Sequence, residues 1–198
     1  MSRNNFSRAT IPQPFGAANW VTAARALYAV CLLAYSLWAL AADHAPGPTM
    51  RWFWVVGALG ALALDGVDGR LARQLGQASA FGARFDMEAD AATMLGLSLM
   101  VLLCDQAGTW VLAAGLMRYI FVGASWVWPA LATPLPPRKR RQAICVVQMA
   151  VLILAVVPSV PSEWARPLCL TGLAVLVYSF ALDVVLANRV GEKKEAVV

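Results

Sequence analysis

The sequence predicts an all-α membrane protein with six transmembrane helices and both termini in the cytoplasm. Three observations lead to this prediction: a strongly apolar composition, six apolar segments of suitable length, and an uneven distribution of basic residues. Of the 198 residues, 60% are hydrophobic and only 14% are charged, whereas soluble domains are about half apolar and a quarter charged. The composition therefore favours a chain that folds in lipid, and its length suits a single domain.

Six segments have about the 20 predominantly apolar residues that a helix needs to cross a hydrocarbon core of about 30 Å. Short connections rich in Pro, Gly and Asp separate them. In chain order the predicted spans are Trp20–Ala42, Trp52–Ala72, Phe85–Leu103, Gly108–Leu131, Ala143–Val157 and Pro167–Ala187. We therefore expect an N-terminal segment (residues 1–19), either interfacial or an unstructured tail, then a six-helix transmembrane catalytic domain (20–188) and a cytoplasmic tail (189–198).

The basic residues lie mainly on one side of these spans. Twelve Lys and Arg fall in the termini, in the connections after the second and fourth spans or, for Arg70, in the last turn of the second span. Two fall in the opposite connections and two lie deeper inside spans, which accounts for all 16. The positive-inside rule then places both termini in the cytoplasm. We expect the membrane itself to be a bacterial inner membrane. We interpret the cluster from Arg138 to Arg141 as a topology signal rather than a nucleic-acid site. Attraction of anionic headgroups or of a phosphorylated substrate is the alternative.

Several common types of site are disfavoured by residue type and spacing. The four cysteines lie far apart in apolar runs, which is typical of buried thiols rather than of a disulfide framework or a zinc site. His44 is the one histidine of the chain and stands beside a predicted loop. The sequence therefore argues strongly against a histidine metal site and against a Ser-His-Asp triad.

Four aspartates interrupt the apolar pattern near the cytoplasmic ends of the second and third spans. Counted at about 1.5 Å per residue from the predicted span ends, Asp65 and Asp68 lie about 10 and 6 Å deep. Counted from Arg84, where the chain enters the next span, Asp86 and Asp90 lie about 3 and 9 Å deep. The i,i+3 and i,i+4 spacings put each pair on one helix face. If those faces meet, the four carboxylates converge just below the cytosolic surface.

Such a cluster needs a counter-charge, because each charged residue deep in a span costs about 2.5–3.5 kcal/mol on the insertion scale. Hard divalent cations favour clustered carboxylate oxygens, and a pair of Mg²⁺ or Mn²⁺ ions would also grip a diphosphate. A proton or ion pathway lined by the same aspartates is the competing interpretation, and solvation by water or pairing with an arginine, such as Asp65 with Arg70, could also suffice. Spacing alone leaves these interpretations open.

The complete pattern of these residues resembles the signature of the CDP-alcohol phosphotransferase family. Eight defined positions over 26 residues are filled at the expected spacing: Asp65-x-x-Asp68-Gly69-x-x-Ala72-Arg73, then eight residues, then Gly82-x-x-x-Asp86-x-x-x-Asp90. The size and the six-span layout are also similar to that family. Upstream, Asn19-x-x-Thr22-x-x-Arg25 is similar to a motif that often opens the first span there. This motif is weaker than the main signature, and polar residues at a helix start are the less favoured alternative.

The resemblance implies a reaction and a set of residue roles. Members transfer the phosphate-containing half of a CDP-linked molecule to an alcohol and release CMP. The four aspartates would coordinate the divalent metals, and Asp90 would also be the general base that deprotonates the acceptor hydroxyl. The nucleotide and diphosphate would be bound at Gly69, Ala72, Arg73, Gly82 and Thr22. Glycine admits close backbone approach, and the planar fork of arginine suits phosphate oxygens.

By the same resemblance, we expect CDP-diacylglycerol as the donor and a small alcohol as the acceptor. Our best interpretation of the acceptor is glycerol 3-phosphate, with serine, inositol phosphate or another alcohol as alternatives. The residues that would bind a phosphorylated acceptor are Arg118, Arg25, Arg138 and Arg141. For Arg118, the role of an internal partner of an aspartate is an equally good interpretation. The pair Ala91–Ala92 follows Asp90 where phosphatidylglycerophosphate synthases often have Lys, a departure that weakens assignment to that subfamily.

Other functions remain as alternatives at this stage. A transporter or ion pathway would need polar residues through both membrane halves, but the fifth and sixth spans are almost wholly apolar, with Gln148 and Asp183 as exceptions. A family member that binds nucleotide without turnover is a further alternative. Homodimers are common in this family, so a homodimer is compatible with the resemblance, and we expect membrane lipids but no nucleic acid as partners.

Overall fold

The computed structural model describes residues 17–74, 80–127 and 139–195 of the chain. This part is all-helical, which confirms the predicted α class, and it contains no strand. Its elements are α1 (Ala17–Ala41), α2 (Pro48–Gln74), α3 (Ala80–Leu103), the 3-10 helix η1 (Thr109–Val111), α4 (Leu112–Val127), α5 (Lys139–Val156) and α6 (Ser162–Glu195).

Each predicted span falls on a helix, but several ends differ. Helix α6 begins five residues before Pro167 and continues to Glu195, through most of the segment that we expected to be a tail. At about 1.5 Å per residue, its 34 residues extend about 51 Å, well beyond a hydrocarbon core of about 30 Å. Helix α5 begins at Lys139, so three of the four clustered basic residues lie in its first turn instead of in a loop. Both helices thus extend beyond the apolar segments that defined the predicted spans.

Two segments, Val21–Ala41 and Ser162–Leu182, are long and apolar enough to cross a membrane, and Thr109–Ala124 and Gln142–Val156 are shorter apolar helices. Helix α3 does not meet this criterion, because its uninterrupted apolar part begins only after Asp90. Six spans with cytoplasmic termini therefore stay a prediction. The hydropathy signal fails in α3 because the helix also carries the predicted site.

Many large apolar side chains are exposed on the outer faces of the helices. Phe53, Trp126 and Trp164 are 63%, 83% and 72% exposed, and similar residues recur along α1, α2, α4 and α6. Soluble monomers rarely expose apolar patches of this extent, because the contact of such patches with water is unfavourable. The outer surface is thus suited to contact with lipid chains, in agreement with the apolar helices.

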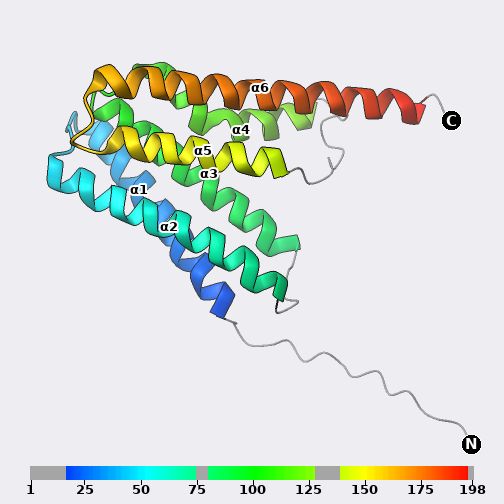
Figure 1. Cartoon of the computed structure of the whole chain (residues 1–198), viewed down its shortest axis with the longest axis horizontal. Helices are drawn as coiled ribbons and strands as arrows, with labels where there is room; N and C mark the ends of the chain where they lie inside the picture. Colours follow the sequence, from blue (N-terminus) through cyan, green and yellow to red (C-terminus); the bar gives the residue numbers. More distant parts are fainter. Residues whose placement is uncertain (1–16, 75–79, 128–138, 196–198) are drawn as a thin grey trace, which may run out of the picture.

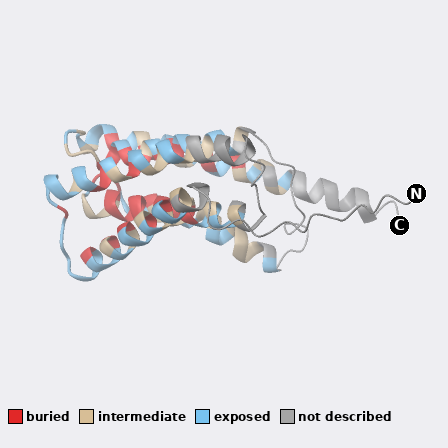
Figure 2. Ribbon diagram, turned by 90° about the horizontal axis from the view of Figure 1, so that it is seen from below, coloured by how far each residue is buried: buried red, intermediate tan, exposed pale blue. Residues whose placement is uncertain are grey.

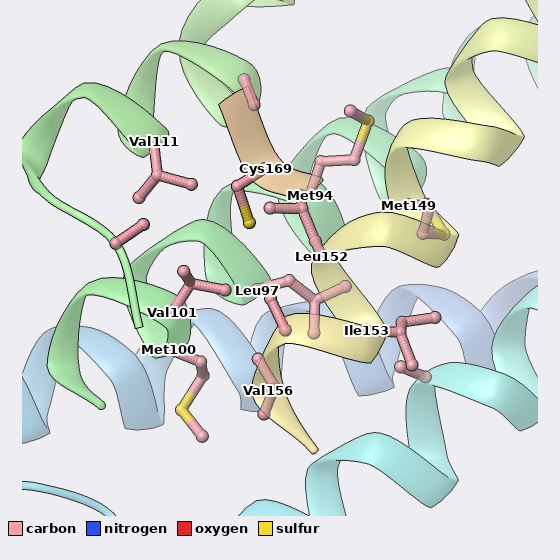
Figure 3. Packing of buried hydrophobic residues seen from close by; sticks show 14 of the residues in the cluster. Met94, Leu97, Met100, Val101, Val111, Met149, Leu152, Ile153, Val156 and Cys169 are labelled. Atoms are coloured by element: carbon pink, nitrogen blue, oxygen red, sulfur yellow. The ribbon is translucent and has the colours of Figure 1, made fainter. Parts of the chain in front are cut away.

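The helices lie closest together at the end that holds the α1–α2, α3–η1 and α5–α6 connections (Figure 1). Toward the other end, α1, α2 and α3 diverge from α4, α5 and α6 (Figure 1). Figure 2 shows buried residues concentrated in the half with the short connections. In that half, Leu97 of α3, Leu152 of α5 and Cys169 of α6 pack together (Figure 3). The apolar core therefore fixes one half of the bundle and leaves the diverging end for polar groups.

Two of the connections begin with the same type of helix end. After α1, the amide of His44 donates to the carbonyl of Ala39 (2.8 Å), and after α3 the amide of Gln106 donates to that of Val101 (3.0 Å). These are the six-to-one bonds of the Schellman motif, which needs a residue with positive φ before the donor. Asp43 and Asp105 occupy those positions, with φ of 49° and 52°. Aspartate tolerates this backbone conformation better than most residues other than glycine and asparagine.

At the same end, Arg51 joins α2 to α5. Its Nε donates to the carbonyl of Val156 (2.8 Å) and its Nη2 to that of Val157 (3.1 Å). These carbonyls belong to the last turn of α5 and the residue after it, where helical carbonyls have no partner within the helix and where a cation is favourable. Arg51, one of the two basic residues expected on the non-cytoplasmic side, therefore closes a helix end.

Glycines permit close contacts between α3 and its neighbours. A Cβ on Gly115 of α4 would lie 2.5 Å from the Cα of Leu95 in α3, and one on Gly96 of α3 would lie 2.8 Å from Cγ of Leu32 in α1. Small residues at such crossings allow helix backbones to pack directly in membranes, where no hydrophobic effect drives association. These contacts set the position of α3 against α1 and α4.

We expect Gly115→Ala to destabilise the protein by about 1–3 kcal/mol, as overpacking typically does. The atom in conflict is a backbone Cα, which cannot turn aside as a side chain can. Thermal unfolding of the full chain in detergent measures the effect. Gly123→Ala is the matched control on the same helix, since a Cβ there meets nothing within 4 Å. Equal melting temperatures for the two variants would contradict the close α3–α4 packing.

Candidate active site

Three helices bring one arginine and three aspartates to a common level. Arg25 lies eight residues after the start of α1, Asp65 nine residues before the end of α2, and Asp90 ten residues after the start of α3. At about 1.5 Å per residue, these positions are about 12–15 Å from helix ends that share the diverging end of the bundle (Figure 1). Asp86 lies one turn before Asp90, on the same face of α3.

The four side chains are in direct contact. Nη1 of Arg25 lies 3.0 Å from Oδ1 of Asp65 and also contacts Oδ1 of Asp86, to which it donates a hydrogen bond. Nη2 of Arg25 donates to Oδ1 of Asp90 at 2.6 Å. One carboxylate oxygen from each of the three aspartates lies within 4.8 Å of the other two. A single guanidinium thus joins α1 to α2 and α3.

The arginine is enclosed while the carboxylates are partly open. The side chain of Arg25 is 4% exposed, against 21% for Asp65 and 37% for both Asp86 and Asp90. A substrate or ion can therefore reach the aspartates from the side that Arg25 does not cover. With every group ionised, three carboxylates and one guanidinium leave two negative charges, so the cluster favours a further cation.

Some of the predicted site residues lie beyond what the structure describes. Helix α2 continues through the signature positions after Asp65, but the side chains of Asp68, Gly69, Ala72 and Arg73 are outside the described residues. The same holds for the side chain of Arg141 and for all of Arg138. Of the remaining positions, Gly82 lies one turn before Asp86 on α3, and Thr22 lies one turn before Arg25 on α1; both are half-buried.

Arg118 does not join the aspartate cluster. Its Nη2 donates to Oε1 of Glu88, which projects from α3 between Asp86 and Asp90 in sequence but lies on a different helix face. The side chains of Arg118 and Glu88 are 29% and 53% exposed. The Nε of Arg118 is enclosed and has no hydrogen-bond partner among the described residues. Arg118 is thus paired with an acidic residue of α3, and one donor of its guanidinium is left over.

The contact of Arg25 with the aspartates is the feature that sequence reasoning missed. We grouped Arg25 with the basic residues that would bind the acceptor, whereas the structure places it against Asp65, Asp86 and Asp90. Counting helix depth, which placed the aspartates at one level, would have placed Arg25 there too. Depth says nothing about which face of α1 meets α3, and that depends on packing such as the contact of Leu32 with Gly96.

Comparison with known proteins decides the family. The family model for CDP-alcohol phosphatidyltransferases matches residues 15–185, which include all four helices that carry the described site. The chain belongs to this family. Searches among curated proteins and among solved structures returned no match.

Membership in the CDP-alcohol phosphatidyltransferases indicates transfer of a substituted phosphate group from a CDP-alcohol to an alcohol. It also supports the membrane protein that the apolar helices indicate. The family is generally dependent on divalent metals, and the cluster of Asp65, Asp86 and Asp90 is compatible with that requirement. Carboxylate oxygens are the ligands that Mg²⁺ and Mn²⁺ prefer, and oxygens within 4.8 Å of one another can contact a shared ion.

We expect the Arg118–Glu88 ion pair to contribute less than about 1 kcal/mol to stability. Both side chains are partly exposed, so solvent weakens the attraction between their charges. A double-mutant cycle of Arg118→Gln and Glu88→Gln, measured by thermal unfolding, gives the coupling energy. A coupling energy of several kcal/mol would show instead that the pair fastens α4 to α3.

Proposed function

We propose that this protein transfers a phosphatidyl group from CDP-diacylglycerol to a small alcohol, with release of CMP, at a site on the cytoplasmic side of the membrane. The single observation that supports this most directly is the convergence of Asp65, Asp86 and Asp90 within a chain of the CDP-alcohol phosphatidyltransferase family. A lipid donor fits a membrane-embedded protein whose outer faces are apolar. The excess of basic residues near this end of the helices supports a cytoplasmic site.

We propose that Asp65, Asp86 and Asp90, with Asp68, hold Mg²⁺ or Mn²⁺, with two ions as the expected number. When bound, the metal neutralises the diphosphate and the charge that develops on the leaving CMP. The chain itself binds and orients the substrates. By analogy with the family signature, we assign binding of the diphosphate oxygens to Arg73 and contact with the nucleotide to Gly69, Ala72, Gly82 and Thr22.

The proton of the acceptor hydroxyl goes to Asp90. The hydroxyl oxygen attacks the phosphorus that bears the diacylglycerol, and the bond from that phosphorus to the bridging oxygen of CMP breaks, so that CMP leaves with the electron pair. Asp90 is suited to accept the proton because more than a third of its side chain is open. In the structure its Oδ1 accepts a hydrogen bond from Nη2 of Arg25.

For the acceptor, we propose glycerol 3-phosphate, with serine and inositol phosphate as alternatives. The support comes from Arg118, whose enclosed Nε has no partner among the described residues and offers a donor to a phosphate oxygen. Glu88 holds the other end of this guanidinium and thereby orients it. Arg138 and Arg141, near the start of α5, belong to the same proposed anion-binding group, and Arg25 joins it only when its guanidinium leaves the aspartates.

The first prediction of this proposal is loss of transfer on removal of a carboxylate. Asp90→Asn and Asp86→Asn are each expected to lower the rate of CMP release from labelled CDP-diacylglycerol by at least about 10²-fold, the lower range for loss of a general acid or base. Thin-layer separation of the lipid product, with a panel of alcohols and Mg²⁺ or Mn²⁺, identifies the acceptor. Glu163→Gln is the control and should keep full activity. Glu163 is exposed in the first turn of α6, at the end of the bundle opposite the aspartates.

Failure to release CMP with any alcohol, while the folded protein binds no CDP, would contradict the proposed function. Metal-dependent ion flux in liposomes without nucleotide turnover would support the transport alternative. Binding of CDP without turnover would instead indicate a nucleotide-binding member of the family.

The second prediction concerns Arg118. If its guanidinium binds an acceptor phosphate, Arg118→Gln raises the KM for glycerol 3-phosphate roughly 10- to 100-fold, the value of one hydrogen bond to a charged group. The KM for CDP-diacylglycerol stays unchanged. Steady-state kinetics with each substrate varied in turn provide the test, and serine serves as the acceptor without a phosphate. An unchanged KM for every phosphorylated acceptor would leave Arg118 with only its contact to Glu88.

A further inference from the structure

Arg25 is the one charged side chain, among the residues that the structure describes, that is almost fully buried. Burial of a guanidinium is unfavourable unless its donors and its charge find partners. Arg25 finds three: Oδ1 of Asp65, Oδ1 of Asp86 and Oδ1 of Asp90. The burial of Arg25 and the position of the three carboxylates therefore depend on each other.

The partners of Arg25 are the carboxylates of the proposed metal site. A divalent ion binds to carboxylate oxygens at about 2.0–2.2 Å, closer than any N–H donor. A guanidinium held between the same three side chains occupies Oδ1 of each and repels an incoming cation. Strong coordination of all three carboxylates to a metal therefore weakens their hydrogen bonds and ion pairs with Arg25, and the reverse also holds. The geometry thus makes the metal and Arg25 competitors.

We propose that Arg25 is an internal competitor of the divalent metal: its guanidinium balances the carboxylates of α2 and α3, and metal binding displaces it. This inference rests on the proposed metal site. Once displaced, the guanidinium stays tethered to α1 beside the site, and its planar fork is suited to phosphate oxygens. Metal loading thereby turns Arg25 from a partner of aspartates into a donor for the phosphate groups of a substrate.

A purely supporting role for Arg25 predicts the opposite effect on metal affinity. If Arg25 only aligns the carboxylates for the metal, its loss disorders the ligands and weakens metal binding, as loss of groups that orient ligands generally does. If Arg25 competes, its loss frees the oxygens and strengthens binding. The sign of the change in affinity therefore separates the two roles.

The experiment compares Mn²⁺ binding to the wild-type full chain and to Arg25→Gln in detergent, without nucleotide, with free Mn²⁺ measured by electron paramagnetic resonance. The dissociation constant for Mn²⁺ is expected to fall at least about tenfold in Arg25→Gln, equivalent to about 1.4 kcal/mol. The melting temperature in chelator is expected to fall, and its rise on addition of Mn²⁺ to exceed that of the wild type. An unchanged or larger dissociation constant would overturn the proposal.

Arg84→Gln is the matched control for charge. Arg84 is exposed on α3, two residues before Asp86, and its substitution removes the same positive charge close to the cluster. Its Mn²⁺ dissociation constant is expected to stay within about twofold of the wild type, because screened surface charges act weakly. A tenfold change in both variants would attribute the effect to net charge and overturn the role of Arg25.

Arg25→Lys decides the matter if Arg25→Gln does not fold. Lysine keeps the charge but lacks the fork that reaches three carboxylates at once, so Mn²⁺ should bind more tightly than in the wild type. Equal or weaker binding in the folded Lys variant would count against displacement. Absence of Mn²⁺ binding in the wild type and in every variant would overturn both the proposed metal site and this inference, whereas normal binding that Arg25 does not affect would overturn the inference alone.

Discussion

The contact of Arg25 with Asp65, Asp86 and Asp90 is the interaction on which the diverging end of this bundle depends. Three carboxylates in an apolar setting are unfavourable by about 2.5–3.5 kcal/mol each on the insertion scale, and they repel one another. One buried guanidinium meets all three, at 3.0 Å from Asp65 and 2.6 Å from Asp90. Because the partners lie on three helices, the same contact that compensates the charges also fixes how α1, α2 and α3 meet.

The rest of the molecule makes this arrangement possible. The apolar core and the closure of α5 by Arg51 lie in the half of the bundle with the short connections. Gly96 and Gly115 allow α1 and α4 to approach α3 closely. With one half packed in this way, the helices diverge at the other end, and their polar residues are only partly covered. Partial exposure of Asp86 and Asp90 suits transfer from a CDP-alcohol to an alcohol, since both substrates have to reach the carboxylates.

The contacts of Arg25 and Arg118 show why residue type alone does not assign a role. Arg25 and Arg118 both lie inside predicted spans, and both were grouped with the acceptor on the basis of charge. Arg25 is enclosed by three aspartates, whereas Arg118 is partly exposed, contacts Glu88 and keeps one donor unpartnered among the described residues. The environment of each guanidinium, rather than its charge, suggests displacement by metal for one and recognition of an anion for the other.

The sequence by itself determined the helical class, the six apolar segments and the family, because composition and the spacing of the signature residues are local properties of the chain. Depth counting also placed Asp65, Asp86 and Asp90 at one level, since helix rise per residue is constant. Helix ends were predicted less well: the apolar limits of Pro167–Ala187 missed most of the length of α6, because helical hydrogen bonding continues where hydropathy stops. Only the tertiary structure decided that Arg25 joins the aspartates and that Arg118 pairs with Glu88 instead. Those partners depend on the rotation of α1 and α4 about their axes, which is fixed by packing against α3 at Gly96 and Gly115 and leaves no local signal in the sequence.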